Sequence, residues 1–414
     1  MLLPKPALKI TLRMGGMKWI TPPFPPLSLL SSTQGFGFSI KESPQDFAVE
    51  EMASLPEFGG GNYCYFMLEK EGKTTQEALE AVANALSIPA KSIWCAGQKD
   101  RQAKTIQAAC AYGVGKEKLA SARLPPSIRV NYLGHASRQL KIGMLLGNRF
   151  RIRAGGVEKE GTKKKVAEIA REISFCFPNY FGPQRFGQRG NTHTVGKFIL
   201  QGRMQDAAEC YLMECGGSEN EAQCSARKRL KEEGDFGQAL LHFPSSLAYE
   251  RRMLEVLARE PNNYVKAFMA LPRQTLLVFA HSCQSWLFNL ELSRLVEEGR
   301  QNAEGDAGAS ICVFGTNSLG FPDENSKEGK KWVALNLIGW DSKINEMEKA
   351  LLESNEMRLS DFKAGKMPFL SCKGGARSAL CPLANFSFDG GWFSFELPPG
   401  AYATCALAEF GLKK

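Results

Sequence analysis

The first 190 residues carry short apolar or alternating segments, which predict strands, between segments with helical spacing. The predicted strands are residues 47–51, 63–68, 93–96, 128–133 and 145–153, and the predicted helices are residues 74–86 and 162–176. Thr74 and Glu77 form a capping-box pattern, which supports a helix start there. This half of the chain is therefore predicted to be a mixed α/β unit.

Helical spacing dominates after about residue 192. The predicted helices are residues 196–215, 219–233, 236–241, 246–259, 263–269 and 276–299. Residues 299–310 and 315–331 are predicted loops, and strand patterns return at 332–337 and 392–397. The apolar run 276–292 is interrupted by polar residues such as His281 and Asn289, so it reads as a buried helix. The simplest architecture is an α/β (α+β) unit made from both chain ends and interrupted by a mainly helical insertion.

The composition is typical of a soluble globular protein, with 43% hydrophobic and 23% charged residues. A chain of 414 residues is long for one core and suggests two units. The net charge of +9 favours a polyanionic partner without proving one. We find no secretory signal, no C-x-x-C pair among the 12 cysteines and no cluster of the four histidines. We therefore expect no metal site, and reduced thiols in a cytoplasm.

One carboxylate stands out among the charged residues. Asp100 lies between Lys99 and Arg101, after the short apolar run at residues 93–96. Nearby cations favour the ionised form of a carboxylate, so the segment could hold a nucleophile. On these residues alone, a turn with solvated charges is the favoured interpretation.

A second motif changes this balance. Residues 179–187 read N-Y-F-G-P-Q-R-F-G, and residues 97–107 fit G-x-K-D-x-x-A-x-T-x-Q. Together they resemble the tRNA pseudouridine synthase D family. Further segments that are similar to the family lie at residues 41–51, 142–150, 284–289 and 397–404. The resemblance covers nearly the whole chain, from about residue 40 to residue 404.

The resemblance implies a pseudouridine synthase catalytic core with a mixed, largely antiparallel sheet. This core is expected to comprise residues 1–190 and 371–414, with an insertion domain at residues 191–370. The implied reaction isomerises uridine without a cofactor, and Asp100 corresponds to the family's catalytic Asp. Whether Asp100 attacks C1′ or helps to remove a sugar proton stays open.

The other expected site residues fall into two groups. The base pocket and catalytic support would comprise Lys41, Phe47, Glu51, Asn179 and Phe181. The resemblance implies that Lys41 is the basic partner of Asp100. The RNA contacts would comprise Lys99, Arg101, Lys104, Gln184, Arg185, Arg189 and Arg377. Taken without the motifs, these residues would be solvated charges, a core aromatic or a loop-capping Asn. The role of Arg377 is less secure, because relatives often carry two adjacent Arg residues there.

Three other classes of protein share some of these sequence features. A GTPase would need a G-x-x-x-x-G-K-[ST] loop, which the sequence lacks. A metal-dependent nuclease would need clustered carboxylates or histidines. A tRNA-binding or RNA-folding module without catalytic activity stays open, because binding alone would preserve the same basic and aromatic residues. The family resemblance instead implies a cytoplasmic tRNA pseudouridine synthase acting at position 13, without membrane or obligatory protein partner, and a monomer is the simplest oligomeric state. Residues 1–34 receive no function.

Overall fold

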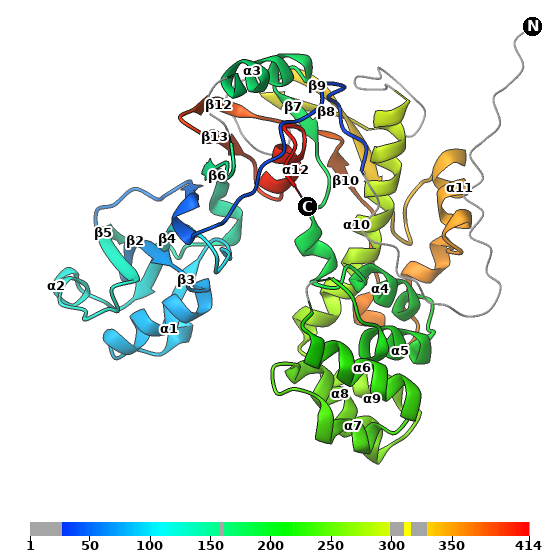
Figure 1. The fold of residues 1–414 in the computed structure, drawn as a ribbon. Coiled ribbons are helices and arrows are strands. Elements are labelled where there is room, and N and C mark those ends of the chain that lie inside the picture. The colour runs from blue at the N-terminus through cyan, green and yellow to red at the C-terminus, as the bar shows by residue number, and fades with distance from the viewer. Residues whose placement is uncertain (1–26, 158–160, 218, 299–309, 316–328, 414) are drawn as a thin grey trace, which may run out of the picture. The chain divides into compact units, whose positions relative to one another are not determined.

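The computed structural model describes residues 27–157, 161–217, 219–298, 310–315 and 329–413. They form two compact units, which are visible in Figure 1. We call residues 183–283 and 360–372 the helical unit. We call the described parts of residues 27–182, 284–359 and 373–414 the sheet unit.

Residues 284–359 belong to the sheet unit, although the expected insertion runs through residues 191–370. The boundary between the two units at residues 283 and 284 falls inside one long helix, α10 (Arg273–Glu297). Much of the predicted loops 299–310 and 315–331 lies outside the described residues. How the two units correspond to a catalytic domain and an insertion stays a prediction.

An eight-stranded sheet forms the centre of the sheet unit. Its strands are β1 (Phe47–Ala53), β2 (Tyr63–Glu71), β3 (Ile93–Cys95), β4 (Lys104–Tyr112), β5 (Ile128–Ala136), β6 (Leu145–Arg153), β12 (Ala384–Asp389) and β13 (Trp392–Leu397). Their order is β12-β13-β6-β1-β4-β2-β5, with β3 beside β4. Only β1 and β4 pair in parallel among these described strands. The predicted mixed, largely antiparallel sheet is thus confirmed.

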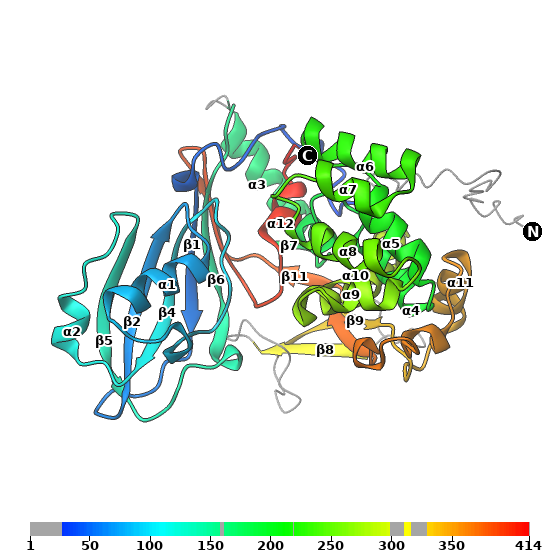
Figure 2. The same ribbon diagram turned by 90° about the horizontal axis from the view of Figure 1, so that it is seen from below.

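Helix α1 (Thr75–Ala85) covers one face of this sheet, as Figure 2 shows. Its start is the predicted one, since the Thr74 hydroxyl accepts a hydrogen bond from the Glu77 amide. Val82 and neighbouring apolar residues of the helix pack against Phe66 of β2 and Ala109 of β4. The short helix α2 (Lys116–Ala120) follows β4. Ile93 of β3, which precedes the segment that carries Lys99 and Asp100, belongs to the same apolar cluster.

The helix predicted at residues 162–176 is shorter than expected. Helix α3 spans Thr162–Glu172, because Ser174 and Phe175 adopt positive φ angles of 51° and 55° that cannot continue it. The residues that follow form β7 (Cys176–Pro178), which pairs with β11 (Leu380–Pro382). This small ladder leads directly into the N-Y-F-G segment.

The remaining elements of the sheet unit form a second, three-stranded sheet and two helices. The strands are β8 (Ser310–Gly315), β9 (Gly329–Leu337) and β10 (Gly375–Ser378), in the order β10-β9-β8. The helices are α11 (Glu346–Ser354) and α12 (Ala403–Ala408). Short 3-10 turns in the two units lie at Pro44–Asp46, Ala90–Ser92, Ile142–Met144, Pro183–Phe186, Leu359–Phe362 and Pro368–Leu370.

The segment Ser28–Thr33 is held to the sheet unit by two carboxylates. Glu409 accepts hydrogen bonds from two of its backbone amides, and Glu172 accepts from its amides and hydroxyls. Burial raises the pKa of Glu409 to about 7, whereas hydrogen bonds from Ser32 and Thr33 lower that of Glu172 to about 2. Tyr180 donates its hydroxyl to the carbonyl of Ser28 at 2.9 Å. This segment is therefore part of the folded unit.

The helical unit contains the helices predicted after residue 192, with one correction. They are α4 (Thr192–Leu200), α5 (Met204–Met213), α6 (Glu221–Glu233), α7 (Phe236–His242), α8 (Ala248–Arg259) and α9 (Tyr264–Met269). The single helix predicted at residues 196–215 is two helices, because Gly202 has a φ of 73° and breaks it.

A buried ion network lies inside the helical unit. Arg227 is fully buried and donates to Glu219, to Glu250 at 2.7 Å, and to the carbonyls of Tyr211 and Leu212. Arg189 lies 3.7 Å from the Glu219 carboxylate and 3.8 Å from that of Glu250. Two guanidinium groups thus balance two carboxylates inside the unit.

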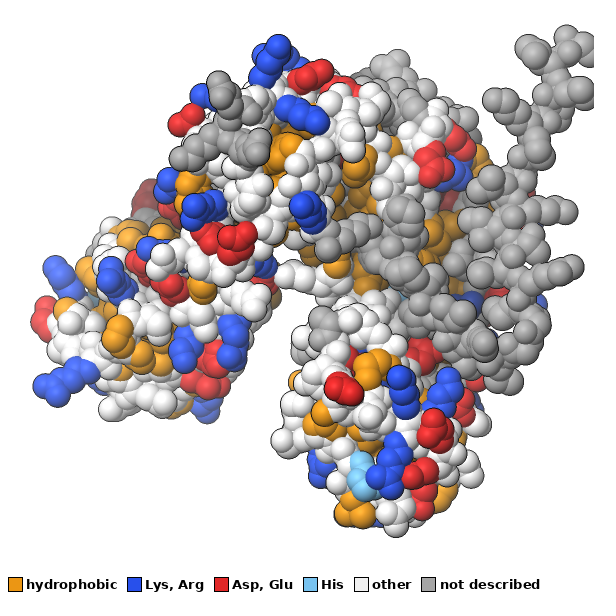
Figure 3. Space-filling view, viewed as in Figure 1, with side chains coloured by type: hydrophobic (Ala, Val, Ile, Leu, Met, Phe, Trp, Pro, Cys, Tyr) orange, Lys and Arg blue, Asp and Glu red, His pale blue; other side chains and the backbone are white. Residues whose placement is uncertain are grey.

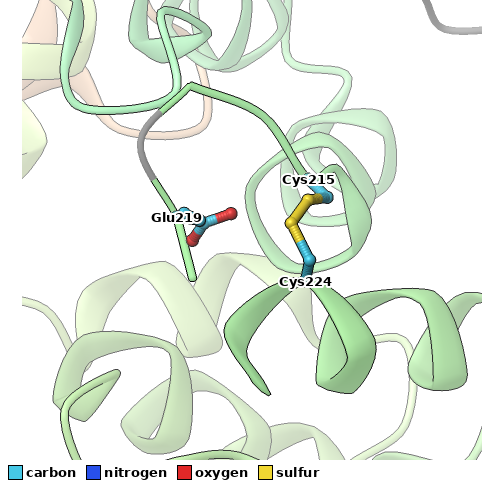
Figure 4. Close-up of side chains that lie close together, drawn as sticks. All are labelled: Cys215, Glu219 and Cys224. Atoms are coloured by element: carbon cyan, nitrogen blue, oxygen red, sulfur yellow. A yellow bond between two sulfur atoms is a disulfide. The ribbon is translucent and has the colours of Figure 1, made fainter. Parts of the chain in front are cut away.

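Cys215 and Cys224 form a disulfide that joins the end of α5 to α6 (Figure 4). Their Cα atoms are 5.1 Å apart, within the usual range for this bond. The expectation of reduced thiols is therefore wrong for this pair, whereas the other nine cysteines in the described parts of the chain are in the thiol form. Glu219 lies beside the pair, and the three residues form the one group among the described residues that could hold a metal ion. Sulfurs joined to each other lack the thiolate charge that metal binding requires.

None of the helices in the described ranges combines the length and the apolar character needed to cross a membrane.

Candidate active site

Asp100 lies in the loop that connects β3 to β4 in the sheet unit. Its Oδ2 atom lies 2.9 Å from the ammonium of Lys41, which donates a hydrogen bond to it. The Asp100 side chain is 41% exposed and that of Lys41 is 18% exposed. A carboxylate that solvent can reach, with an ammonium beside it, is stabilised in its ionised form. The structure thus brings together the two residues that the sequence predicts to act as a pair.

The aromatic ring of Phe47 lies against the ammonium of Lys41. The Lys41 ammonium lies 4.3 Å from the centre of the Phe47 ring, within range for a cation–π contact. Phe47 is only 5% exposed and packs edge-on against Phe150 of β6. Lys41 itself has a positive φ of 62°, which is uncommon for a residue with a side chain. The ring of Phe47 therefore belongs to the core and supports the lysine that contacts Asp100.

The backbone of the Asp100 loop is fixed at several points. Gln107 of β4 donates to the carbonyl of Gly97 at 2.9 Å, and the amide of Lys99 donates to Thr75 at 2.8 Å. Thr75 in turn donates to Gln107, so these contacts form one buried network. Strand β4 is not among the predicted strands, although its Thr105 and Gln107 belong to the first motif. Both are fully buried, and the side chain of Gln107 is used for the hydrogen bonds with Gly97 and Thr75.

Glu51 and Lys99 form a second, buried pair next to this loop. Their Oε2 and Nζ atoms are 3.0 Å apart, and the two side chains are 0% and 7% exposed. Lys99 also donates to the side chain of Asn148 at 2.6 Å. Burial raises the pKa of Glu51, and the positive charge of Lys99 opposes this rise. Because its ammonium already has partners inside the protein, the position of Lys99 does not support its expected role as an RNA contact.

Asn179 follows β7 and lies in a separate group of contacts within the sheet unit. Arg377 donates through Nη2 to the Asn179 side-chain oxygen at 2.7 Å and through Nε to its carbonyl at 3.0 Å. The side-chain nitrogen of Asn179 donates to the carbonyl of Ser378. Arg377 also donates to the carbonyl of Gly400. Arg377 was expected among the RNA contacts, but the structure shows that it holds Asn179 in place.

Phe181 is held through both its backbone and its ring. Asn289 of α10 accepts from the Phe181 amide at 2.8 Å and donates to its carbonyl at 2.9 Å. The Arg377 guanidinium lies 4.1 Å from the ring centre, and Phe288 and Tyr402 contact the ring edge-on. The residue is 8% exposed. A nucleobase that stacked on this ring would use an aromatic group that is already rigid.

The other expected RNA contacts differ in how accessible they are. Arg101 and Lys104 are partly exposed and form surface ion pairs with Glu77 and Glu69. Gln184 is exposed and Arg185 is half-buried, both in the helical unit. The Arg189 side chain is 9% exposed and belongs to the buried network, so the expectation that it contacts RNA is not supported by its position.

Three residues that contact the predicted site were missed. Lys70, Asn148 and Asn289 bond to Asp100, Lys99 and Phe181, respectively. Lys70 could have been noticed, because it continues the face of β2 on which Phe66 and Leu68 are buried. A lysine at an inward-facing strand position needs a partner.

The chain matches the family model described as tRNA pseudouridine synthase D (TruD) over residues 27–410. Relatives named tRNA pseudouridine synthase D include a protein from Thermococcus sibiricus, which is 35% identical over 92% of this chain and 96% of its own. A relative of the same name from Archaeoglobus fulgidus is 34% identical over the same shares. A crystal structure described as tRNA pseudouridine synthase D from Methanosarcina mazei superposes with a TM-score of 0.76 at 28% identity. It covers 92% of this chain and 95% of the other.

Proposed function

Because the chain belongs to the tRNA pseudouridine synthase D family and isomerises uridine to pseudouridine in tRNA, we propose that Asp100 is its catalytic carboxylate. We further propose that uridine 13 of tRNA is its target and that it acts as a cytoplasmic monomer. The proposal for Asp100 depends above all on its 2.9 Å ion pair with Lys41 in a loop with a fixed backbone.

The reaction places defined demands on the site. The bond between C1′ and N1 of uridine breaks, the base turns, and a bond forms between C1′ and C5. C5 loses a proton and N1 gains one, so the atoms balance without a second substrate. The site must therefore present a carboxylate to the sugar, support the base and retain it while it is free.

Asp100 meets the first demand. Its side chain is accessible, and the ammonium of Lys41 stabilises the negative charge that a reacting carboxylate needs. Phe47 keeps that ammonium in place from within the core. The geometry is compatible with attack on C1′ and with removal of a sugar proton, since both begin from an ionised carboxylate.

Phe181 and Asn179 are proposed to support the base. Stacking a base on an aromatic side chain is worth about 1–3 kcal/mol. Asn289 and Arg377 fix the ring and its backbone before any base arrives, so little ordering is left for the substrate to induce. The Asn179 side chain is oriented by Arg377 and Ser378, which defines which of its atoms can face a base.

The proposed phosphate contacts are now Arg101, Lys104, Gln184 and Arg185. On the face drawn in Figure 3, basic and acidic side chains alternate on both units and do not gather by sign. We therefore expect binding through individual residues of each unit, and each phosphate contact should add roughly −0.9 to the slope of log affinity against log salt on duplex nucleic acid.

The target position is tested by mapping pseudouridine on tRNA transcripts. Purified protein is incubated with a transcript that carries uridine 13, and carbodiimide labelling with primer extension locates each pseudouridine. A transcript with cytidine 13 is the matched control. A stop at position 13 in the first transcript alone supports the proposal, and a stop elsewhere refutes the assigned position. Tight binding without any stop would favour the tRNA-binding module that does not catalyse a reaction.

We expect the Arg377→Lys variant to lower kcat by about 10- to 100-fold. One ammonium cannot reproduce the planar pair of bonds to Asn179, and each lost bond to a charged group costs about 1.5–3 kcal/mol. Single-turnover rates at saturating tRNA measure the effect. Arg149→Lys, a change at an exposed guanidinium on β6, is the control.

The salt dependence of tRNA binding separates this role from the RNA contact that the sequence suggests. If Arg377 only positions Asn179, its substitution leaves the slope of log affinity against log salt unchanged. A slope reduced by about one with an unchanged kcat would instead identify a phosphate contact.

A further inference from the structure

Lys70 is a lysine in the core of the sheet unit. It lies near the end of β2, opposite Thr105 of β4 and Ile128 of β5, and it is 0% exposed. Its Nζ atom donates to the backbone carbonyl of Asp100 at 2.7 Å. An apolar residue of similar length would avoid the free-energy cost of burying an ammonium. Packing alone therefore does not explain a lysine at this position.

The contact made by Lys70 complements the one made by Lys41. Lys41 contacts the carboxylate of Asp100, whereas the fully buried Lys70 contacts its main-chain carbonyl. Gln107 fixes the same loop three residues earlier, at Gly97. The position of the carboxylate thus depends on two lysines, of which only one touches it.

We propose that Lys70 is a positioning residue that fixes the backbone at Asp100 and adds positive charge behind the carboxylate. This inference rests on the proposed catalytic role of Asp100. Lys70 does not touch substrate, so its loss should lower the rate of the reaction and leave tRNA binding intact.

The protonation of Lys70 gives the proposal a second consequence. Burial lowers the pKa of Lys70 to about 8. The negative charges of Asp100 and Glu77 oppose this shift, and the positive charge of Lys99 adds to it. The residues opposite Lys70 on β4 and β5, Thr105 and Ile128, are uncharged. The ammonium should therefore lose its proton as the pH rises through about 8, and activity should fall with it.

Stability is expected to change in the other direction. The unfolded chain holds the Lys70 proton up to about pH 10.4, whereas the folded chain releases it near pH 8. Between these values the unfolded state binds more protons, so this residue makes the folded state more stable as pH rises. If the loss of activity above pH 8 came from unfolding, the stability of the protein would fall together with its activity and would not rise.

The test compares Lys70→Met and Lys70→Arg with wild type in steady-state kinetics from pH 6 to 9.5. Met keeps the length without the charge, and Arg can still donate while staying protonated throughout this range. Lys118→Met, an exposed change on α2, is the control. Thermal melts of every variant identify any that fail to fold.

The expected result is a 10- to 100-fold lower kcat for Lys70→Met, with KM within twofold of wild type. The fall in activity above pH 8 should be seen in wild type and be missing in both variants. A kcat within twofold of wild type for Lys70→Met would overturn the inference. So would an increase in KM alone, or a loss of activity that only parallels a lower melting temperature. Asp100→Asn is assayed beside them: if it stays active, the proposed role of Asp100 is wrong, and if it alone is inactive, only the inference about Lys70 fails.

Discussion

The Asp100→Asn protein should form pseudouridine at least about 10³-fold more slowly than wild type and still bind tRNA with nearly unchanged affinity. Asn has the size of Asp, so the loop held by Lys70 and Gln107 should keep its shape. It lacks the negative charge that both possible roles of Asp100 require. Release of tritium from C5 of labelled uridine in tRNA measures the rate, and filter binding measures the affinity.

Asp389→Asn provides the matched control for this change. It removes the same charge from a side chain that is 84% exposed and pairs only with the exposed Lys163 among the contacts described. Its activity should equal that of wild type. A tritium-release rate for Asp100→Asn within tenfold of wild type would show that another group carries out the reaction.

The Arg227→Met protein should lose about 3–5 kcal/mol of unfolding free energy in the helical unit. The substitution removes the partner that donates to both Glu219 and Glu250, and these carboxylates are nearly inaccessible to water. Arg189 stays nearby, but its contacts with them are longer. Urea denaturation followed by circular dichroism measures the change.

Arg229→Met on the same helix is the control for this prediction. Arg229 forms an exposed pair with Glu233, one turn further along α6, and such pairs contribute at most about 1 kcal/mol. If the two variants were equally stable, the buried network would not stabilise the helical unit in the way proposed.

Two features near the catalytic loop were predicted for different reasons. The family resemblance pairs Lys41 with Asp100 although they are 59 positions apart in the sequence, and the structure places the two side chains 2.9 Å apart. Thr74 and Glu77 were expected to start a helix, and they do, because a capping box involves only residues within one turn.

Contacts between distant residues could not be predicted in this way. Lys99 and Arg189 have the charge and motif position of RNA contacts, but their carboxylate partners lie on other elements and become neighbours only on folding. Cys215 and Cys224 are nine residues apart without a recognisable spacing, and only the turn between α5 and α6 brings their Cα atoms together. The burial of Lys99 and Arg189, which depends on the whole fold, therefore determines how accessible their charges are.

The tie between Ser28–Thr33 and the rest of the sheet unit matters to anyone who shortens this protein for crystallisation. The recognisable motifs start shortly after residue 34, so a shortened chain could be designed to begin there. Such a chain would lack the backbone amides that donate to Glu409 and Glu172. It would also leave the Tyr180 hydroxyl, next to Phe181, without its acceptor. A chain that keeps these contacts has to begin at or before Ser28, although no motif marks that position.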